Sequence, residues 1–404
     1  MKVLVFNCGS SSLNYKVFDI AKERYQLLAS GKAHRVGVTS TQAAFLEHHG
    51  PKQNKKIETQ LPNHQVVAQM VLDQLESESL GVDAVGHRFV HGGNYFRQSV
   101  ILTPENKEKL KACLPLAPIH NPNSFRVIQV CMQRLPGIPE YVTFDTAFHA
   151  TLPPHAYTYP LPQELIDRFG YRKFGFHGLS YAYVISRAAE LMELSISSAR
   201  IIACHLGTGG SSVLAYQNGA AVDTSMGFSP LPGLVMSTRT GDLDPILPLF
   251  LLDNLGCTPE DLEIIFNKKS GLLGVSGFSS DLRDLQDRIA QDGYPPAILA
   301  YEMAVHRIKK YIGAYGVLMG GLDVLIFTDD IGVHNWKLRE AVCNGLQWLG
   351  IDLDLTANQN YTPNQNNLLS TPSSKVKIIT MPTDEEWVIA SEGNLLLQGQ
   401  HADF

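Results

Sequence analysis

Two short segments rich in glycine and hydroxyl side chains are the first candidates for chemistry. They are Cys8-Gly9-Ser10-Ser11-Ser12 and Gly207-Thr208-Gly209-Gly210-Ser211-Ser212, about half the chain apart. Each lies between two apolar runs, which predicts a strand, a tight turn and a second strand. Backbone N–H groups and hydroxyls in such turns can bind phosphate oxygens, and the alternative is a purely structural hairpin. Neither segment has the GxxxxGK[ST] pattern of a P-loop.

Charged residues follow two further apolar runs. Arg88 lies in a strand-like segment before two glycines, where its planar fork could hold a carboxylate or phosphate or form a surface salt bridge. Asp145 ends the run 141–144, and a buried carboxylate is costly unless it is paired or functional. His87 and His91 are four residues apart, but the strand-like context and the missing Glu argue against a metal pair.

A histidine and a second arginine complete the candidate set. His177 is flanked by Gly175 and Gly178, which would let a ligand approach, although a lone histidine is more often a hydrogen-bonded core residue. Arg239 lies in the polar loop 236–245. Phosphoryl transfer needs cations and donors around three equatorial oxygens, together with a divalent ion. The two turns, two arginines, histidine and aspartate together favour such a site.

The elements that must position these residues repeat along the chain. The runs at 2–6 and 201–206 each lead into a glycine-rich turn, and buried strands with a glycine turn are expected later, at 83–86 and 323–327. This repetition favours two duplicated α/β domains facing one another. Helices are expected from about 296 to 319, after Gly178, and from Glu385 on. The polar segment 356–374 is expected to be a surface excursion.

Composition limits the class of protein. The chain has 404 residues, 44% hydrophobic residues and a net charge of −6, which fits two or three globular domains and no polyanion-binding surface. The longest apolar stretch, 246–252, falls short of the ~18 residues of a membrane span, and the N-terminal run is too short for a secretory signal. Six scattered cysteines without a CxxC pair indicate reduced thiols in a cytoplasmic protein.

Ten motifs, taken in order, resemble those of acetate kinases along the whole chain. They are Asn7–Ser12, Gly86–Arg88, His91–Gly93, Leu116–Pro122, Phe144–His149, Gly175–Gly178, Asp223–Phe228, Thr238–Asp242, Asn267–Gly271 and Pro382–Glu386. The resemblance implies an α/β protein with two duplicated actin-like (RNase H-like) domains, an active-site cleft between them, and a homodimer. We expect an N-terminal domain at 1–148, a C-terminal domain at 149–385, and residues 386–404 packed back onto the first.

The same resemblance implies roles for individual residues. Asp145 would be the catalytic carboxylate, and because acetate is already ionised at pH 7, positioning is an easier role for it than proton removal. Arg88 would bind acetate or acetyl phosphate, and His177 with Arg239 would stabilise the transferring phosphoryl group. Asn7 and Glu385 would hold Mg²⁺, directly or through water, with Mn²⁺ as the alternative ion.

Two further groups of residues match family positions. An apolar pocket for the methyl group would consist of Val90, Ile119, Phe176 and Pro230. The phosphates of the donor would be bound by Asn7, Ser10, Ser12, His205, Gly207, Thr208, Gly209, Gly210, Asp281 and Arg283.

The chain departs from the family pattern on the side of the nucleotide. Asn14 stands where most acetate kinases have lysine, and Thr208 replaces an asparagine. The adenosine loop becomes 329–334, with Asp330 in place of a glycine and Asp329 beside it. These changes favour a donor without adenosine, and the sequence is also similar to the pyrophosphate-linked acetate kinases of amoebae.

The sequence therefore predicts a cytoplasmic, Mg²⁺-dependent enzyme that interconverts acetyl phosphate and orthophosphate with acetate and pyrophosphate. The alternatives are an ordinary ATP-dependent acetate or propionate kinase and a catalytically inactive actin-like scaffold. No nucleic-acid or membrane partner is expected.

Overall fold

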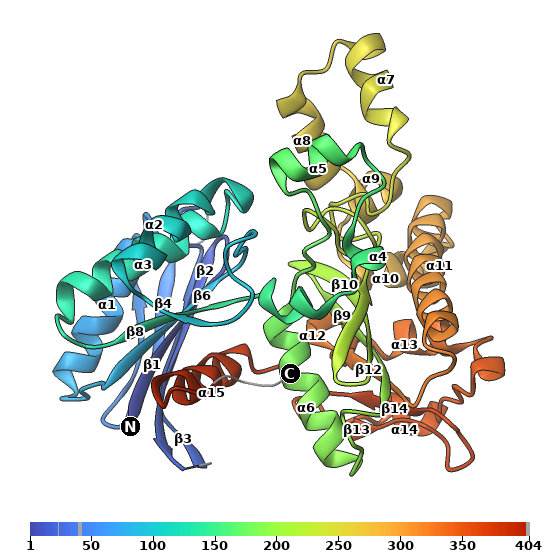
Figure 1. Cartoon of the computed structure of the whole chain (residues 1–404). Helices are drawn as coiled ribbons and strands as arrows, with labels where there is room; N and C mark the ends of the chain where they lie inside the picture. The colour runs from blue at the N-terminus through green and yellow to red at the C-terminus, as the bar shows by residue number, and fades with distance from the viewer. Residues whose placement is uncertain (23, 39–42, 401–404) are drawn as a thin grey trace. The chain divides into compact units, whose positions relative to one another are not determined.

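The computed structural model describes residues 1–22, 24–38 and 43–400. It contains two compact units (Figure 1). Unit 1 consists of Met1–Ala150 and the segment from Asp384 on, and unit 2 consists of Thr151–Thr383. The domain boundaries that the sequence predicts, at residues 148 and 385, stay a prediction. Among the described residues, no helix combines the length and apolar character that crossing a membrane requires.

Unit 1 is built on one mixed sheet of strand order β5-β4-β3-β2-β1-β6-β8-β7. The strands are β1 (Lys2–Cys8), β2 (Ser12–Ala21), β3 (Arg24–His34), β4 (Phe45–His49), β5 (Asn54–Glu58), β6 (Ala84–Phe89), β7 (Val100–Ile101) and β8 (Glu140–Phe144). The helices are α1 (His64–Ser77), α2 (Pro104–Ala112), α3 (Asn121–Arg134) and α15 (Glu385–Leu397), with short 3₁₀ turns at Leu114–Leu116 and Ala147–Thr151.

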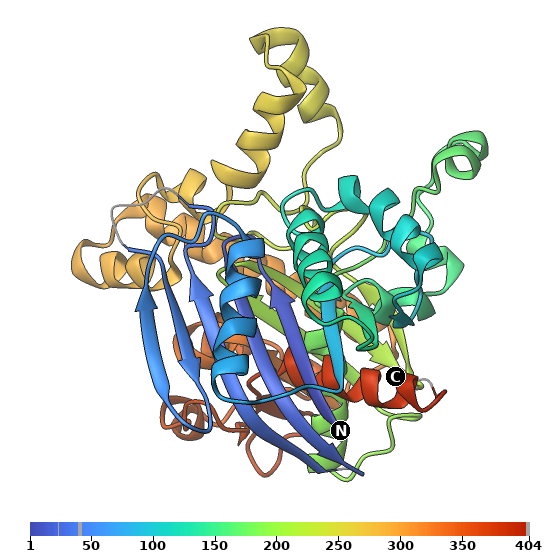
Figure 2. The same ribbon diagram turned by 90° about the vertical axis from the view of Figure 1, so that its left-hand side faces the viewer.

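Helices cover both faces of this sheet. Figure 2 shows α1 and α3 across one face, and α15 lies on the other. The helix α15 follows unit 2 in the chain yet packs closely on β8. The Tyr141 hydroxyl donates to the carbonyl oxygen of Ile389 at 2.9 Å, and a Cβ on Gly393 would lie 1.9 Å from the Tyr141 ring. Only glycine permits this approach.

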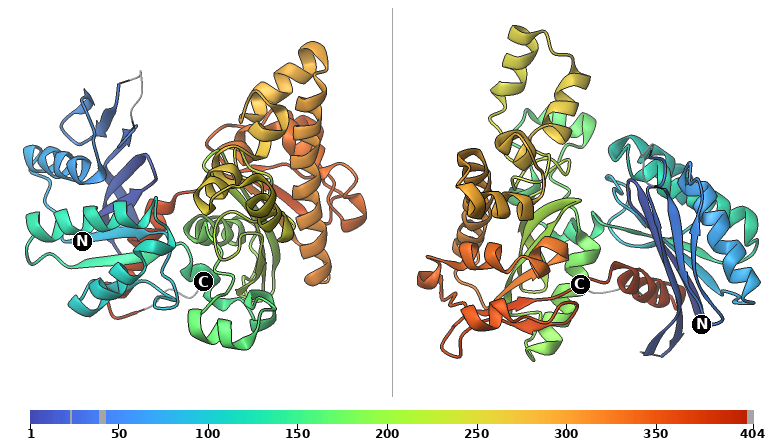
Figure 3. Two further views of the ribbon diagram at one scale, coloured as in Figure 1. Left: turned by 90° about the horizontal axis from the view of Figure 1, so that it is seen from above. Right: turned by 180° about the vertical axis from the view of Figure 1, so that it is seen from behind.

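Unit 2 is built on a sheet of strand order β11-β10-β9-β12-β14-β13. Its strands are β9 (Arg200–Gly207), β10 (Gly210–Gln217), β11 (Ala220–Thr224), β12 (Val324–Thr328), β13 (Asn367–Leu368) and β14 (Lys377–Thr380). Its longer helices are α6 (Gly178–Leu191), α7 (Ile246–Leu255), α8 (Pro259–Lys268), α10 (Leu282–Asp292), α11 (Pro295–Leu318) and α13 (Trp336–Cys343). Short helices are α4 (Pro154–Tyr157), α5 (Gln163–Phe169), α9 (Gly271–Ser276), α12 (Asp329–His334), α14 (Leu355–Gln359) and a 3₁₀ turn at Gln347–Leu349. Figure 3 shows α6 and α11 on opposite faces of the sheet.

The two sheets share a five-strand core, which confirms the predicted duplication. In unit 1 the order is β3-β2-β1-β6-β8, and in unit 2 it is β11-β10-β9-β12-β14. In both cores the first two pairings in this order are antiparallel and the next two are parallel. The predicted hairpin turns, the long helix near 296–319 and the helix after Gly178 are also confirmed.

Three details of the prediction were wrong. Gly86 lies inside β6 rather than in a turn, because the Tyr141 side chain packs where a Cβ would be. Residues 329–334, which were expected to form a loop, form α12, whose first turn carries two aspartates that suit a helix N-terminus. The segment 356–374 is only partly a surface excursion, since Asn358 and Leu369 in it are fully buried.

Candidate active site

Three parallel strands of unit 1 bring Asn7, Arg88 and Asp145 to one edge of the sheet. Asn7 lies near the end of β1, Arg88 near the end of β6, and Asp145 directly after β8. Arg88 grips Asp145 through two parallel hydrogen bonds, Nε to Oδ1 at 2.7 Å and Nη2 to Oδ2 at 2.6 Å. Its remaining nitrogen, Nη1, donates to Asn7 Oδ1 at 2.9 Å. Each of the three guanidinium nitrogens of Arg88 therefore makes a hydrogen bond within unit 1, and these bonds use three of its five N–H groups.

Acidic neighbours stabilise the charge of Arg88. Burial would lower the pKa of Arg88, but the carboxylates of Asp145 and Glu385 reverse this and leave the pKa above its ordinary value. The Asp145 side chain is 2% exposed and that of Arg88 is 14% exposed. A buried carboxylate and a cation satisfy each other here, so removing either would leave an uncompensated charge.

The start of α15 supplies further carboxylates to the same edge. Asn7 Nδ2 donates to Glu385 Oε2 and to Glu386 Oε1, both at 2.9 Å. Lys16 Nζ lies 2.7 Å from Asp384 Oδ1 and 3.4 Å from Glu386 Oε2. Carboxylate and amide oxygens are the ligands that Mg²⁺ prefers, so the donors of this cluster fit the metal that Asn7 and Glu385 are predicted to hold.

Sequence reasoning assigned no role to Lys16, Asp384 or Glu386. It noted the lost lysine at Asn14, which lies opposite Asn7 in the β1–β2 hairpin. Side chains two residues apart on a strand share a face, and this alternation would have pointed to Lys16 as the cation beside Asn14.

The turn between β1 and β2 is a tight hairpin. Gly9 N–H donates to the Ser12 carbonyl oxygen at 2.8 Å. His64 Nε2 lies 3.0 and 3.1 Å from the carbonyl oxygens of Gly9 and Ser12, so this nitrogen must carry the hydrogen. The Ser10 side chain is exposed and Ser12 is half-buried. Phosphate binding by this turn stays a prediction.

In unit 2, His177, His205 and Arg239 gather beside the β9–β10 hairpin. His177 has a left-handed backbone (φ 60°) directly before α6, and its ring stacks on His205 with centroids 4.0 Å apart. A Cβ on Gly210 would lie 3.0 Å from Arg239 Nη1 and 3.4 Å from His177 Nε2. The absence of a side chain at Gly210 thus leaves space where a cation and an imidazole meet.

Arg239 is a cation in a poorly solvated place. Its Nη1 donates only weakly, to the Pro230 carbonyl oxygen at 3.4 Å and to Met236 Sδ at 3.8 Å. Burial lowers the pKa of Arg239, and no carboxylate of the described residues lies within ion-pair distance of it. Such a guanidinium is ready to receive an anion.

Two aspartates, Asp329 and Asp330, lie beside the β9–β10 hairpin. Asp329 Oδ2 lies 3.1 Å from His205 Nε2, and a Cβ on Gly207 would lie 1.8 Å from the same oxygen. Asp330 accepts from both N–H and Oγ1 of Thr208, each at 2.9 Å. Asp330 thus accepts hydrogen bonds from the donor groups of Thr208, and the binding of phosphate by these groups stays a prediction.

The remaining predicted residues are spread over both units. Asp281 caps α10 and pairs with the 79% exposed Arg283 at 2.6 Å. Val90 and the exposed Ile119 lie in unit 1, while Phe176 and Pro230 lie in unit 2. Their meeting in one methyl pocket stays a prediction, as does the binding of donor phosphate by Gly209.

Comparison with known proteins identifies the class. The sequence profile of the Acetokinase family matches residues 2–391, so the chain belongs to this family. It is 42% identical to the acetate kinase of Thermoanaerobacter pseudethanolicus over 99% of this chain and all of that relative.

Solved structures agree with this assignment. The acetate kinase of Entamoeba histolytica is 44% identical, with a TM-score of 0.89 over 98% of this chain and 100% of the other. A propionate kinase of Francisella tularensis is 35% identical, with a TM-score of 0.86 over 96% and 98%. The predicted actin-like α/β fold is thereby confirmed.

Proposed function

We propose that this protein is a Mg²⁺-dependent acetate kinase that moves a phosphoryl group directly, in line, between acetyl phosphate and a phosphate acceptor. The observation that carries the proposal is the Arg88–Asp145 pair with Asn7 and Glu385 beside it. This cluster holds a guanidinium next to hard oxygen donors, which is what a carboxylate substrate and a metal-bound phosphate require.

Each unit contributes part of the chemistry. Arg88 binds the acetate carboxylate or the acyl phosphate, and Asp145 holds the guanidinium in its plane. Arg239 and His177 stabilise the transferring phosphoryl group. Asn7 and Glu385 hold Mg²⁺, or Mn²⁺ in its place, which when bound offsets the charge of the donor phosphates. Acetate is ionised at neutral pH, so Asp145 has no proton to remove.

ATP and pyrophosphate are the two candidate phosphoryl donors, and different observations favour each of them. The relatives carry the plain name acetate kinase at 42% identity over their full length, which favours the ordinary ATP/ADP reaction. By the resemblance, Asp330 stands in place of a glycine of the adenosine loop, with Asp329 beside it. Asp330 accepts hydrogen bonds from Thr208, and Asp329 pairs with His205. They support the more specific hypothesis that the acceptor is orthophosphate and the product pyrophosphate.

The acyl group of the substrate is the next part of the proposal. Acetate is the proposed substrate, and propionate is the second candidate because a propionate kinase is 35% identical. One methylene changes binding by only about 1–3 kcal/mol.

We propose a homodimer through α7, which has no buried residue and exposes Ile246, Leu249 and Phe250 by more than half. All six cysteines are free thiols, which supports the cytoplasm as its location.

The test is acetate release from acetyl phosphate, with Mg²⁺ and either orthophosphate or ADP in parallel. Turnover with orthophosphate alone would establish the pyrophosphate reaction, and turnover with ADP alone would establish the ordinary enzyme. A chelator should abolish either activity, and Mg²⁺ or Mn²⁺ should restore it. A folded protein without activity towards acetyl or propionyl phosphate with either acceptor would instead support the inactive scaffold.

A further inference from the structure

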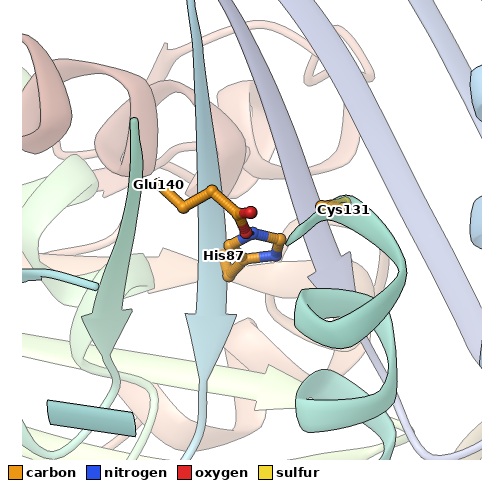
Figure 4. A group of neighbouring side chains, drawn as sticks. All are labelled: His87, Cys131 and Glu140. Carbon is orange, nitrogen blue, oxygen red and sulfur yellow. The ribbon is translucent and has the colours of Figure 1, made fainter. Parts of the chain in front are cut away.

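A second group of metal-ligand side chains lies inside unit 1, separate from Asn7 and Glu385. One ligand atom each from His87, Cys131 and Glu140 lies within 4.8 Å of the other two. His87 comes from β6, Glu140 begins β8, and Cys131 is on α3, which covers the sheet there. Figure 4 shows the imidazole with the Glu140 carboxylate on one side and Cys131 of α3 on the other. It is the one such group that the described residues form.

The three side chains are buried. His87 is 1% exposed, Cys131 0% and Glu140 6%. His87 Nε2 and Glu140 Oε2 are 2.7 Å apart, whereas the other ring nitrogen, Nδ1, is buried and has no hydrogen-bond partner among the described residues. A buried polar nitrogen without a partner costs free energy, so the cluster is incompletely satisfied as it stands.

The chemistry of the three donors selects a class of ion. Imidazole nitrogen, thiolate sulfur and carboxylate oxygen are the protein ligands of Zn²⁺, whereas Mg²⁺ requires oxygen. A Zn²⁺ ion held by a neutral imidazole, a thiolate and a carboxylate forms a site with no net charge, because the two negative ligands balance the two positive charges of the ion. Protons that the ligands carry before binding pass to solvent.

We propose that His87, Cys131 and Glu140 form a buried site for Zn²⁺ or a similar thiophilic divalent cation, with water as a fourth ligand. The bound ion links β6, β8 and α3. The strands it joins lead directly to Arg88 and Asp145, so the ion would stiffen the base of the catalytic edge without touching the substrate.

The test uses the full-length protein with excess Mg²⁺ present, so that Asn7 and Glu385 do not compete for the probe. Zn²⁺ is titrated against a chromophoric chelator, and Co²⁺ is used to detect a cobalt–thiolate charge-transfer band. Wild type should bind one equivalent of Zn²⁺ tightly. Cys131→Ser and Glu140→Gln should each bind Zn²⁺ at least tenfold more weakly than wild type. Cys131→Ser should also lose the band, and Zn²⁺ should raise the Tm of wild type by a few degrees but not that of this variant.

Cys257→Ser and Cys113→Ser are the controls, because they remove a half-buried and a buried thiol outside the cluster. Both should keep the tight equivalent and the band. Binding by Cys131→Ser equal to wild type, loss of binding in Cys113→Ser, or folded wild type without the band would each overturn the proposal. If Cys131→Ser fails to fold, Glu140→Gln, which keeps the shape of the side chain, decides the outcome by its Zn²⁺ affinity.

Discussion

Arg88 and Asp145 face each other as a bidentate ion pair, with the two bonds at 2.7 and 2.6 Å. The carboxylate of Asp145 thus occupies two of the guanidinium nitrogens and fixes the plane of the group. In the proposed function, a substrate carboxylate would approach from the side of Nη1, where Asn7 and Glu385 lie. Asp145 would then act by positioning Arg88 and would not act as a base.

We expect Arg88→Lys and Asp145→Asn each to lower kcat/KM by a factor of about 10² or more. Lysine cannot form the planar double contact, and the asparagine amide would turn an N–H toward the guanidinium. Steady-state assays with acetyl phosphate, with circular dichroism as a control for folding, measure the effect. Near-normal activity in Asp145→Asn would show that the pair does not position the substrate.

Arg239→Ala should reduce kcat by about 10²–10³ while changing the KM for acetate much less. This guanidinium has no ion-pair partner within the described part of the chain and lies beside the space left by Gly210, so its charge is available for the phosphoryl group. The control is Arg288→Ala on α10, an exposed arginine without a proposed role that pairs with Asp292, which should leave activity nearly unchanged. Equal losses of activity in the two variants would contradict the role of Arg239 in stabilising the phosphoryl group.

Donor choice should depend on several residues of the β9–β10 side together. Asp330→Gly frees Thr208, but it leaves Asp329 on His205 and Asn14 in place of lysine. We expect this single change not to create ADP use in an enzyme specific for orthophosphate. Parallel assays with both acceptors test this, and a full switch to ADP by Asp330→Gly alone would contradict it.

The stability of unit 1 should fall as the pH rises through the range from about 4.5 to 7. Burial raises the pKa of Glu392 to about 7 from 4.5, although a hydrogen bond from Ser99 opposes the shift. Between these values the folded chain keeps a proton that the unfolded chain has lost, so raising the pH favours unfolding. Thermal melts of wild type and Glu392→Gln at several pH values measure this. The variant should show a flatter dependence on pH, and unchanged slopes would refute the assignment.

A charge on α7 should separate the proposed dimer. Phe250 and Leu249 are 56% and 54% exposed on a helix that buries none of its residues, and Figure 1 shows this helix extending away from the sheet of unit 2. Phe250→Glu should elute as a monomer in size-exclusion chromatography with light scattering. Glu260→Lys on α8 serves as a charge-change control. Wild type that is monomeric at micromolar concentration would contradict the proposal.

Local sequence patterns predicted those parts of the structure that depend on neighbouring residues. The hairpins around Gly9 and Gly207 follow from alternation and turn residues, and α11 follows from the spacing of Ile308, Ile312 and Tyr315. Contacts across long sequence separations could not be predicted in this way. Glu386 reaches Asn7 because α15 packs on unit 1, and Asp330 reaches Thr208 because β12 pairs with β9. Neither contact produces a periodic pattern of residues in the sequence from which it could be predicted.

The helix α15 also has a consequence for synthesis of the protein. Asn7 is made before unit 2, whereas its partners Glu385 and Glu386 are made 378 and 379 residues later, after the whole of unit 2. A nascent chain therefore carries Arg88 and Asp145 without the carboxylates that complete their edge of the sheet. If the proposed function holds, a product of premature termination within unit 2 would lack these carboxylates, and only the finished molecule would act on acyl phosphates.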